Sequence, residues 1–119
     1  METIGAVTAL AALAHATRLD VFRLLVQTGP DGMPAGRIGE RLGLPSATLS
    51  FHLNHLRHAG LVIFRREGRS LIYVAEYLAM NDLLAYLTAH CCQGDASGCG
   101  VGRCDPAGAA VAKAGGPRP

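Results

Sequence analysis

Residues 34–60 decide the fold, and they read PAGRIGERLGLPSATLSFHLNHLRHAG. Pro34 suits the first position of a helix that ends at Gly43, and Ser46 is a good N-cap for a second helix that ends at Gly60. Each helix carries apolar residues at helical spacing, which are Ala35, Ile38 and Leu42 in the first and Leu49, Leu53 and Leu56 in the second. Two short helices joined by so tight a turn are typical of a helix-turn-helix motif.

Two further helices are predicted before this motif. Residues 4–14 are rich in alanine and leucine. Thr17 lies three residues before Asp20, which resembles a capping box at the start of a second helix. The apolar residues that follow at helical spacing are Val21, Phe22, Leu24 and Leu25. Gly29 and Pro30 are expected to stop this helix.

After the motif, the hydrophobic period changes to that of strands. Residues 61–64 and 71–74 are β-prone, and the basic segment 65–69 (RREGR) joins them, which predicts a hairpin with a basic tip. A last helix is expected from Glu76 to His90. The predicted fold is therefore a mainly α winged helix-turn-helix, in the order α-α-α-α-β-β-α, formed by residues 1–92.

The composition shifts after this domain. Residues 93–119 contain seven of the fifteen glycines and no Leu, Ile, Phe, Tyr or Met. Such a segment buries too little apolar surface to offset its ordering entropy, so we expect a flexible tail. The cysteines of the chain gather at its start and are Cys91, Cys92, Cys99 and Cys104.

Charge and composition restrict the function classes. The net charge is only +2, but basic residues concentrate between positions 45 and 70, where Glu67 is the one acid, as expected of a DNA-facing surface. No apolar run reaches the length of a membrane span, and the N-terminus lacks the basic start of a secretory signal. We therefore expect a cytoplasmic protein with reduced thiols, in which four cysteines indicate a metal or redox role.

The outward side of the second motif helix predicts a surface for duplex DNA. Hydroxyl and amide side chains hydrogen-bond base edges, and Phe51 suits contact with a thymine methyl group. The helix N-terminus suits a phosphate, and basic wing residues suit flanking phosphates or the minor groove. The outward residues are Ser46, Thr48, Ser50, Phe51, Asn54, His55 and His58, and the wing residues are Arg65, Arg66 and Arg69.

Three motifs of the chain occur together, in this order, in a known family. They are Thr17-Arg18-Leu19 with the apolar run after it, residues 49–62 (LSFHLNHLRHAGLV), and residues 65–69 with Tyr73. On these motifs, residues 5–90 resemble the ArsR/SmtB family of bacterial metal-sensing repressors. The resemblance implies a homodimer built on the first and last helices, which binds a pseudo-palindromic operator in successive major grooves. It places the DNA contacts on Ser46, Thr48, Ser50, Phe51, His52, Arg65, Arg66 and Arg69.

Members of this family hold their effector in different places. Here the third helix and the amino terminus have no cysteine, and Asp82 and His90 lack the downstream His-x-x-Glu pair that accompanies a zinc site on the last helix. The cysteine cluster is therefore the expected effector site. It is similar to that of arsenite-responsive members, which implies release of the operator when As(III) or Sb(III) binds Cys91, Cys92 and Cys99, with Cys104 as a spare ligand. Cys91 is expected to continue the apolar stripe of the last helix.

Other functions stay open at this point. Four thiolates also suit zinc, cadmium or lead, and methylated trivalent arsenic needs only two. A DNA-binding protein that responds to cysteine oxidation, or to no ion, has the same DNA-facing residues. A thiol enzyme or metal carrier is a different class, but the sequence offers neither a nucleophile with its base nor a phosphate-binding glycine loop. We expect no catalytic residue.

Overall fold

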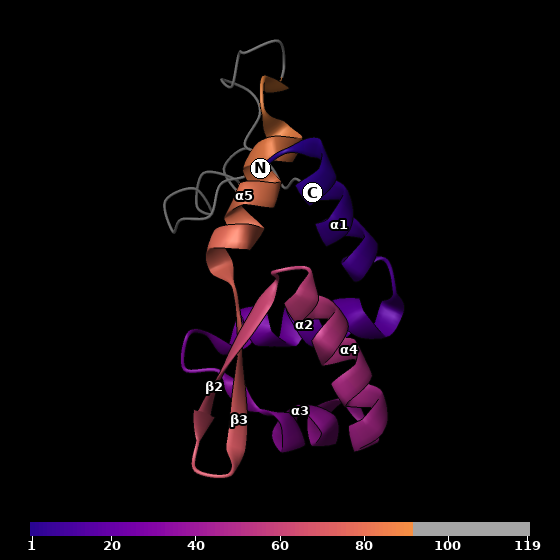
Figure 1. Cartoon of the computed structure of the whole chain (residues 1–119), viewed down its shortest axis with the longest axis vertical. Coiled ribbons are helices and arrows are strands. Elements are labelled where there is room, and N and C mark those ends of the chain that lie inside the picture. The colour runs from indigo at the N-terminus through magenta and orange to yellow at the C-terminus, as the bar shows by residue number, and fades with distance from the viewer. Residues whose placement is uncertain (92–119) are drawn as a thin grey trace, which may run out of the picture. The chain divides into compact units, whose positions relative to one another are not determined.

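The computed structural model describes residues 1–91, and these residues form the predicted winged helix-turn-helix (Figure 1). The fold is mainly helical with an antiparallel hairpin, which confirms the predicted fold class. The predicted tail, residues 93–119, lies outside the described residues. The elements are α1 (Thr3–Leu13), α2 (Ala16–Thr28), β1 (Met33–Pro34), α3 (Ala35–Leu42), α4 (Ser46–His58), β2 (Val62–Glu67), β3 (Ser70–Ala75) and α5 (Tyr77–Thr88).

The sheet has three antiparallel strands in the order β1-β3-β2. The sequence did not predict β1, because its two residues are too few to show a period. The hairpin strands are also longer than predicted, since residues 65–67 belong to β2 and Glu67 pairs with Ser70. Only Gly68, in the left-handed region at φ 63°, and Arg69 form the turn. Charged residues fit this end of the hairpin because both strand ends are exposed there.

The hydrophobic core lies where α2 contacts α1, α3, α4 and β3. Its fully buried side chains are Val21, Leu25, Ile38, Leu53, Leu56, Leu61 and Val62. The Tyr77 hydroxyl lies 3.3 Å from the carbonyl oxygen of Leu25 and 3.1 Å from that of Val26, which fixes the start of α5 against the end of α2. Residues 1–83 thus form one compact unit.

Several helix boundaries differ from the predictions. Pro34 belongs to β1 and is the N-cap of α3, so it is not the first residue of that helix. The N-cap of α2 is His15, whose Nδ1 accepts the Thr17 amide hydrogen bond at 3.2 Å, so Thr17 is not the cap. The N-cap of α4 is Pro45, so Ser46 is the first helical residue instead. Helix α5 ends at Thr88, and His90 has a left-handed φ of 58°. Cys91 therefore follows the helix, and the prediction that it continues the apolar stripe is wrong.

Helix α1 buries its small side chains and exposes its large ones. Ala6, Ala9 and Ala12 face the core, whereas Ile4 is 78% and Val7 58% exposed. An amphipathic helix of a monomeric protein has the opposite arrangement, because burying the larger side chain removes more apolar surface from water. Across residues 1–91, no helix combines the length and apolar character needed to cross a bilayer.

Candidate nucleic-acid interface

Helix α4 has one buried stripe and one broad exposed face. The stripe consists of Leu49, His52, Leu53 and Leu56. At about 100° per residue, Phe51 and Asn54 lie opposite this stripe, and both are exposed. Phe51 is 58% exposed, and its ring edge contacts the rings of His52 and His55. A large exposed aromatic ring beside a polar amide is the kind of surface that reads base edges.

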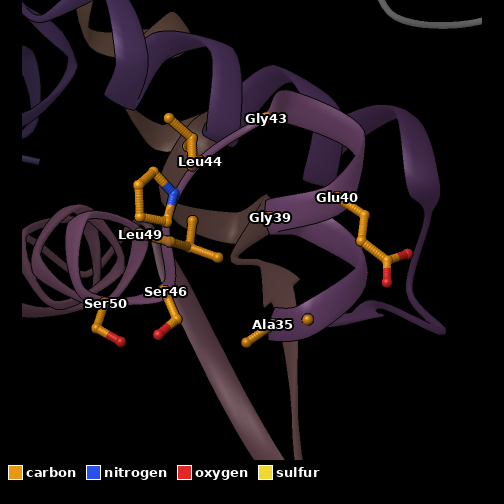
Figure 2. A pocket seen from close by; sticks show the side chains of 10 residues that line it. Ala35, Gly39, Glu40, Gly43, Leu44, Ser46, Leu49 and Ser50 are labelled. Atoms are coloured by element: carbon orange, nitrogen blue, oxygen red, sulfur yellow. The ribbon is translucent and has the colours of Figure 1, made fainter.

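The first turn of α4 borders a hollow of about 440 Å³ between α3 and α4. Figure 2 shows Ser46 and Ser50 on one side of it, whereas Glu40 points away from them. The turn between the helices is tight because Gly39 packs under it, where a Cβ atom would lie 3.1 Å from the Leu44 carbonyl oxygen. The tight turn therefore brings both predicted serines to the rim of this hollow.

The N-terminus of α4 carries unbalanced positive potential. Pro45 caps it without a side-chain hydrogen bond, and no acidic residue lies in the first turn. The first amide groups of a helix have no intrahelical acceptor, and the helix dipole adds to their partial charge. This end of α4, where the exposed Thr48 also lies, favours an anion such as a backbone phosphate.

His55 lies on the other flank of α4. With His58 it lines a hollow of about 390 Å³ toward α1, which Val7, Thr8, Ala11, Ala12 and Ala59 complete. Both histidines are exposed, and His58 Nε2 lies 3.5 Å from an Arg57 guanidinium nitrogen. The predicted contact residues of α4 are therefore spread over two flanks and the outermost line of the helix.

The three wing arginines have different surroundings. Arg65 donates a 2.6 Å hydrogen bond to Glu67 Oε2 and a 2.8 Å bond to the Asp31 carbonyl oxygen, which ties β2 to the loop before β1. Arg66 and Arg69 are exposed and form no ion pair with any residue in the range 1–91. Arg66 and Arg69 therefore present unneutralised charge, whereas part of the charge of Arg65 is already satisfied within the protein.

Arg57 lies in the basic region of the sequence, but the sequence predicts no site role for it. Its guanidinium carbon lies 5.6 Å from the centre of the Phe64 ring on β2, at the distance of a cation–π contact. This contact joins the recognition helix to the wing. The sequence signal for Arg57 was weak, because a single arginine near the end of a helix is common.

His52 is not on the exposed face, although the family resemblance placed a DNA contact there. Its side chain is 6% exposed and packs against His15, with the ring centres 4.7 Å apart. Sequence spacing carried this signal, since residues 49, 52, 53 and 56 follow the i, i+3, i+4, i+7 pattern of one helix face. His52 is therefore not among the proposed DNA contacts.

Comparison with known proteins gives the family. A sequence model described as a helix-turn-helix domain matches residues 13–63. The transcriptional activator HlyU of Vibrio cholerae is 35% identical over 82 residues, which are 66% of this chain and 73% of HlyU. A solved structure of HlyU superposes with a TM-score of 0.58 and covers 73% of this chain and 97% of that one. This chain belongs to the ArsR/SmtB-type family of helix-turn-helix transcriptional regulators.

Two further relatives of this ArsR/SmtB-type chain bear on its assembly and length. The winged helix-turn-helix domain of Mb0332 from Mycobacterium bovis, described as homodimeric and as a possible ArsR-family regulator, is 31% identical with a TM-score of 0.58. The match covers 71% of this chain and 78% of that one. The uncharacterised HTH-type transcriptional regulator Rv0081 of Mycobacterium tuberculosis is 38% identical over 73 residues, 61% of this chain, and the chain spans 62% of its length. None of these proteins is named as an enzyme.

The predicted effector site of this ArsR/SmtB-type regulator lies almost wholly beyond the described chain. Cys92, Cys99 and Cys104 fall outside residues 1–91, and within that range no three His, Cys, Asp or Glu side chains are placed to hold a metal ion. Cys91 is half-buried, directly after the left-handed His90. The thiolate site therefore stays a prediction from the sequence.

Proposed function

We propose that this protein is a transcriptional repressor that binds duplex DNA through α4 and the wing. The observation that carries this proposal is the pairing of a positive α4 N-terminus that has no side-chain cap hydrogen bond with two unneutralised wing arginines, Arg66 and Arg69. Phe51 and Asn54 face the major groove in this arrangement, and Ser46, Thr48 and Ser50 hold the phosphate backbone beside it. Phosphate contacts then position α4, and its outermost residues read the bases.

We further propose that the DNA-binding form is a homodimer built on α1 and α5. Support comes from the exposed apolar side chains of α1 and from Leu78 and Leu87 of α5, which are 73% and 55% exposed. Large apolar side chains left exposed in this way are costly in water unless another molecule covers them. The homodimeric description of Mb0332 favours a second copy of this chain as that molecule. A cytoplasmic location is part of the same proposal.

The proposed effector is As(III) or Sb(III), bound by the thiolates of Cys91, Cys92 and Cys99, with Cys104 as a spare ligand. Soft ions prefer thiolates, and these cysteines lie within fourteen residues of sequence with none elsewhere. Because Cys91 already lies outside α5, ligation does not require the helix to unwind. The bound ion instead fixes the chain directly after the end of the helix.

A DNA-release experiment tests this proposal. A labelled duplex selected from a random-sequence pool is bound by the full chain, and its fluorescence anisotropy is followed while arsenite, antimonite, cadmium, zinc or lead is added. We expect arsenite and antimonite to release the duplex from the wild type but not from Cys91→Ser or Cys92→Ser protein. Release from the Cys→Ser variants would refute the thiolate site, and failure to bind any duplex at low salt would refute DNA binding.

Thiol oxidation is a second candidate effector. A solved structure of HlyU from Vibrio cholerae, at 34% identity and a TM-score of 0.57, is described as reduced HlyU. In the same assay, release by peroxide with reversal by a dithiol, and no response to arsenite, would favour oxidation of the cysteine cluster over ion binding. The name of HlyU as an activator also makes a reporter measurement necessary to decide between repression and activation.

A further inference from the structure

His52 is the one polar residue in the chain up to position 91 whose side chain is buried. Its Nδ1 atom has no hydrogen-bond partner among these residues. A buried polar atom without a partner is rare, because it loses its hydrogen bonds to water and gains none in return. The position matters for function, since His52 lies in the middle of the recognition helix α4.

The titratable groups that face His52 are all basic. At the start of α2 these are the ring of the N-cap His15, with its centre 4.7 Å away, and the guanidinium of Arg18. From α4 itself, His55 lies one turn further along. From α1 the contribution is neutral, since the Ala12 carbonyl oxygen accepts a 2.7 Å hydrogen bond from Arg18 Nε and holds that cation in place. No carboxylate is among these neighbours to stabilise a charged imidazole.

We propose that neutral His52 is a positioning residue that holds the recognition helix against α1 and α2, and that its protonation loosens this contact and weakens DNA binding. The loosening of α4 can be measured on the protein alone, whereas its effect on DNA binding rests on the proposed function. His52 does not touch DNA here, and acts through the placement of α4.

The surroundings of His52 determine in which direction pH shifts the docking of α4, and by how much at most. Burial, and then the charges of His15, Arg18 and His55, hold the pKa of His52 below its ordinary value of 6.5. The loosened conformer, with His52 in water, takes up its proton near pH 6.5, whereas the docked conformer resists it. Docking is therefore fully favourable above about pH 7.5 and weakens as the pH falls through 6.5. At pH 5.5 the population of the loosened conformer relative to the docked conformer rises by a factor of up to about ten, because this pH is one unit below 6.5.

Hydrogen exchange measures this equilibrium without DNA. Protection factors of the α4 amides, corrected for intrinsic exchange, are measured at pH 7.5, 6.5 and 5.5. We expect them to fall by up to about tenfold in the wild type and to stay level in His52→Gln protein. His58→Gln is the matched control, because His58 is an exposed histidine of the same helix, and it should behave like the wild type. Equal behaviour of the wild type and His52→Gln would overturn the proposal.

Two measurements keep the test decisive if His52→Gln does not fold. In the wild type, an NMR titration of the His52 ring protons should give a pKa below the ordinary histidine value of 6.5, and an equal or higher pKa would overturn the proposal. His15→Ser removes one basic neighbour but keeps an N-cap oxygen, so the fall in protection should become smaller. An unchanged fall in the His15→Ser protein would count against the role of His15.

DNA binding is then measured as a separate readout. The probe is a duplex selected from a random-sequence pool at pH 7.5, titrated at pH 7.5 and 5.5. We expect the wild type to lose up to about tenfold more affinity than His52→Gln on acidification. An identical loss in both proteins would overturn the link to DNA binding. If no duplex binds at either pH, the proposed function fails, whereas the hydrogen-exchange result still decides the role of His52.

Discussion

Gly32 lies in the tightest backbone approach of the wing, and we expect Gly32→Ala to destabilise the protein strongly. Its φ of +78° is in the left-handed region, and it precedes the two-residue strand β1. A Cβ atom at Gly32 would lie 2.7 Å from the Tyr73 carbonyl oxygen and 2.7 Å from Val74 Cγ2. Because Tyr73 pairs with Met33, the clash acts directly on the pairing that seats β1 against β3.

The expected cost has two parts. The left-handed conformation costs an alanine about 1–2 kcal/mol. Overpacking against the backbone and side chains of β3 adds about 1–3 kcal/mol, because these contacts with the Tyr73 carbonyl and with β-branched side chains cannot be relieved by moving a flexible side-chain end. Gly32→Ala should therefore lower the free energy of unfolding by about 2–5 kcal/mol, which is a large part of the stability of a small domain.

Gly60 provides the matched control. Its φ of +79° is nearly the same, but a Cβ atom there would have nothing within 4 Å. Gly60→Ala should therefore cost only the conformational part, about 1–2 kcal/mol. The difference between the two variants, measured by urea denaturation followed by circular dichroism, isolates the close approach to β3. Equal losses of stability in both variants would refute this explanation of Gly32.

Two further predictions concern the proposed DNA and dimer surfaces. Arg66→Ala should reduce the salt dependence of duplex binding, with the slope of log K against log salt falling by about 0.9 per lost phosphate contact, or about 1.8 for a dimer, whereas Arg23→Ala on α2 should leave it unchanged. An unchanged slope for Arg66→Ala would remove this residue from the interface. Val7→Ser should cost about 1 kcal/mol of buried apolar surface in each of the two copies, which raises the dimer dissociation constant about thirtyfold. Ile63 is similarly exposed but lies on β2, so Ile63→Ser is the control and should leave the dissociation constant unchanged. Sedimentation measures both, and equal effects would argue against α1 as the dimer surface.

Much of the fold follows from local pattern. The apolar periodicity of α2, α3 and α4, the glycines after α3 and α4, and the two β-prone runs were sufficient to predict the winged helix-turn-helix. Strand β1 was not predictable in this way, because its pairing with β3 is a tertiary contact of only two residues. His15 as the cap of α2 was also missed, since an imidazole nitrogen rarely takes the place of a hydroxyl or carboxylate oxygen there.

The location of the site was predictable from the sequence, but the different surroundings of its individual residues were not. The exposed residues of α4 and the wing arginines followed from helix phase and charge. The engagement of Arg65 by Glu67 and Asp31 did not, because Asp31 is 34 positions away in the sequence. The burial of His52 follows from helix phase, whereas the family resemblance placed a DNA contact at this residue. Helix phase was the better guide at this position.

Helix α1 connects the proposed dimer surface to the recognition helix. Its inner face consists of Ala6, Ala9 and Ala12, and α1 contacts both α2 and α4. Alanine has no side-chain torsion that can absorb a displacement, and a close-packed interior transmits strain instead of damping it. A partner that covers Ile4 and Val7 would therefore set the position of α4 as well as that of α1. In the proposed homodimer, the packing of the two copies would then determine the spacing of the two recognition helices, so an effector that changed this packing would also change the fit to DNA.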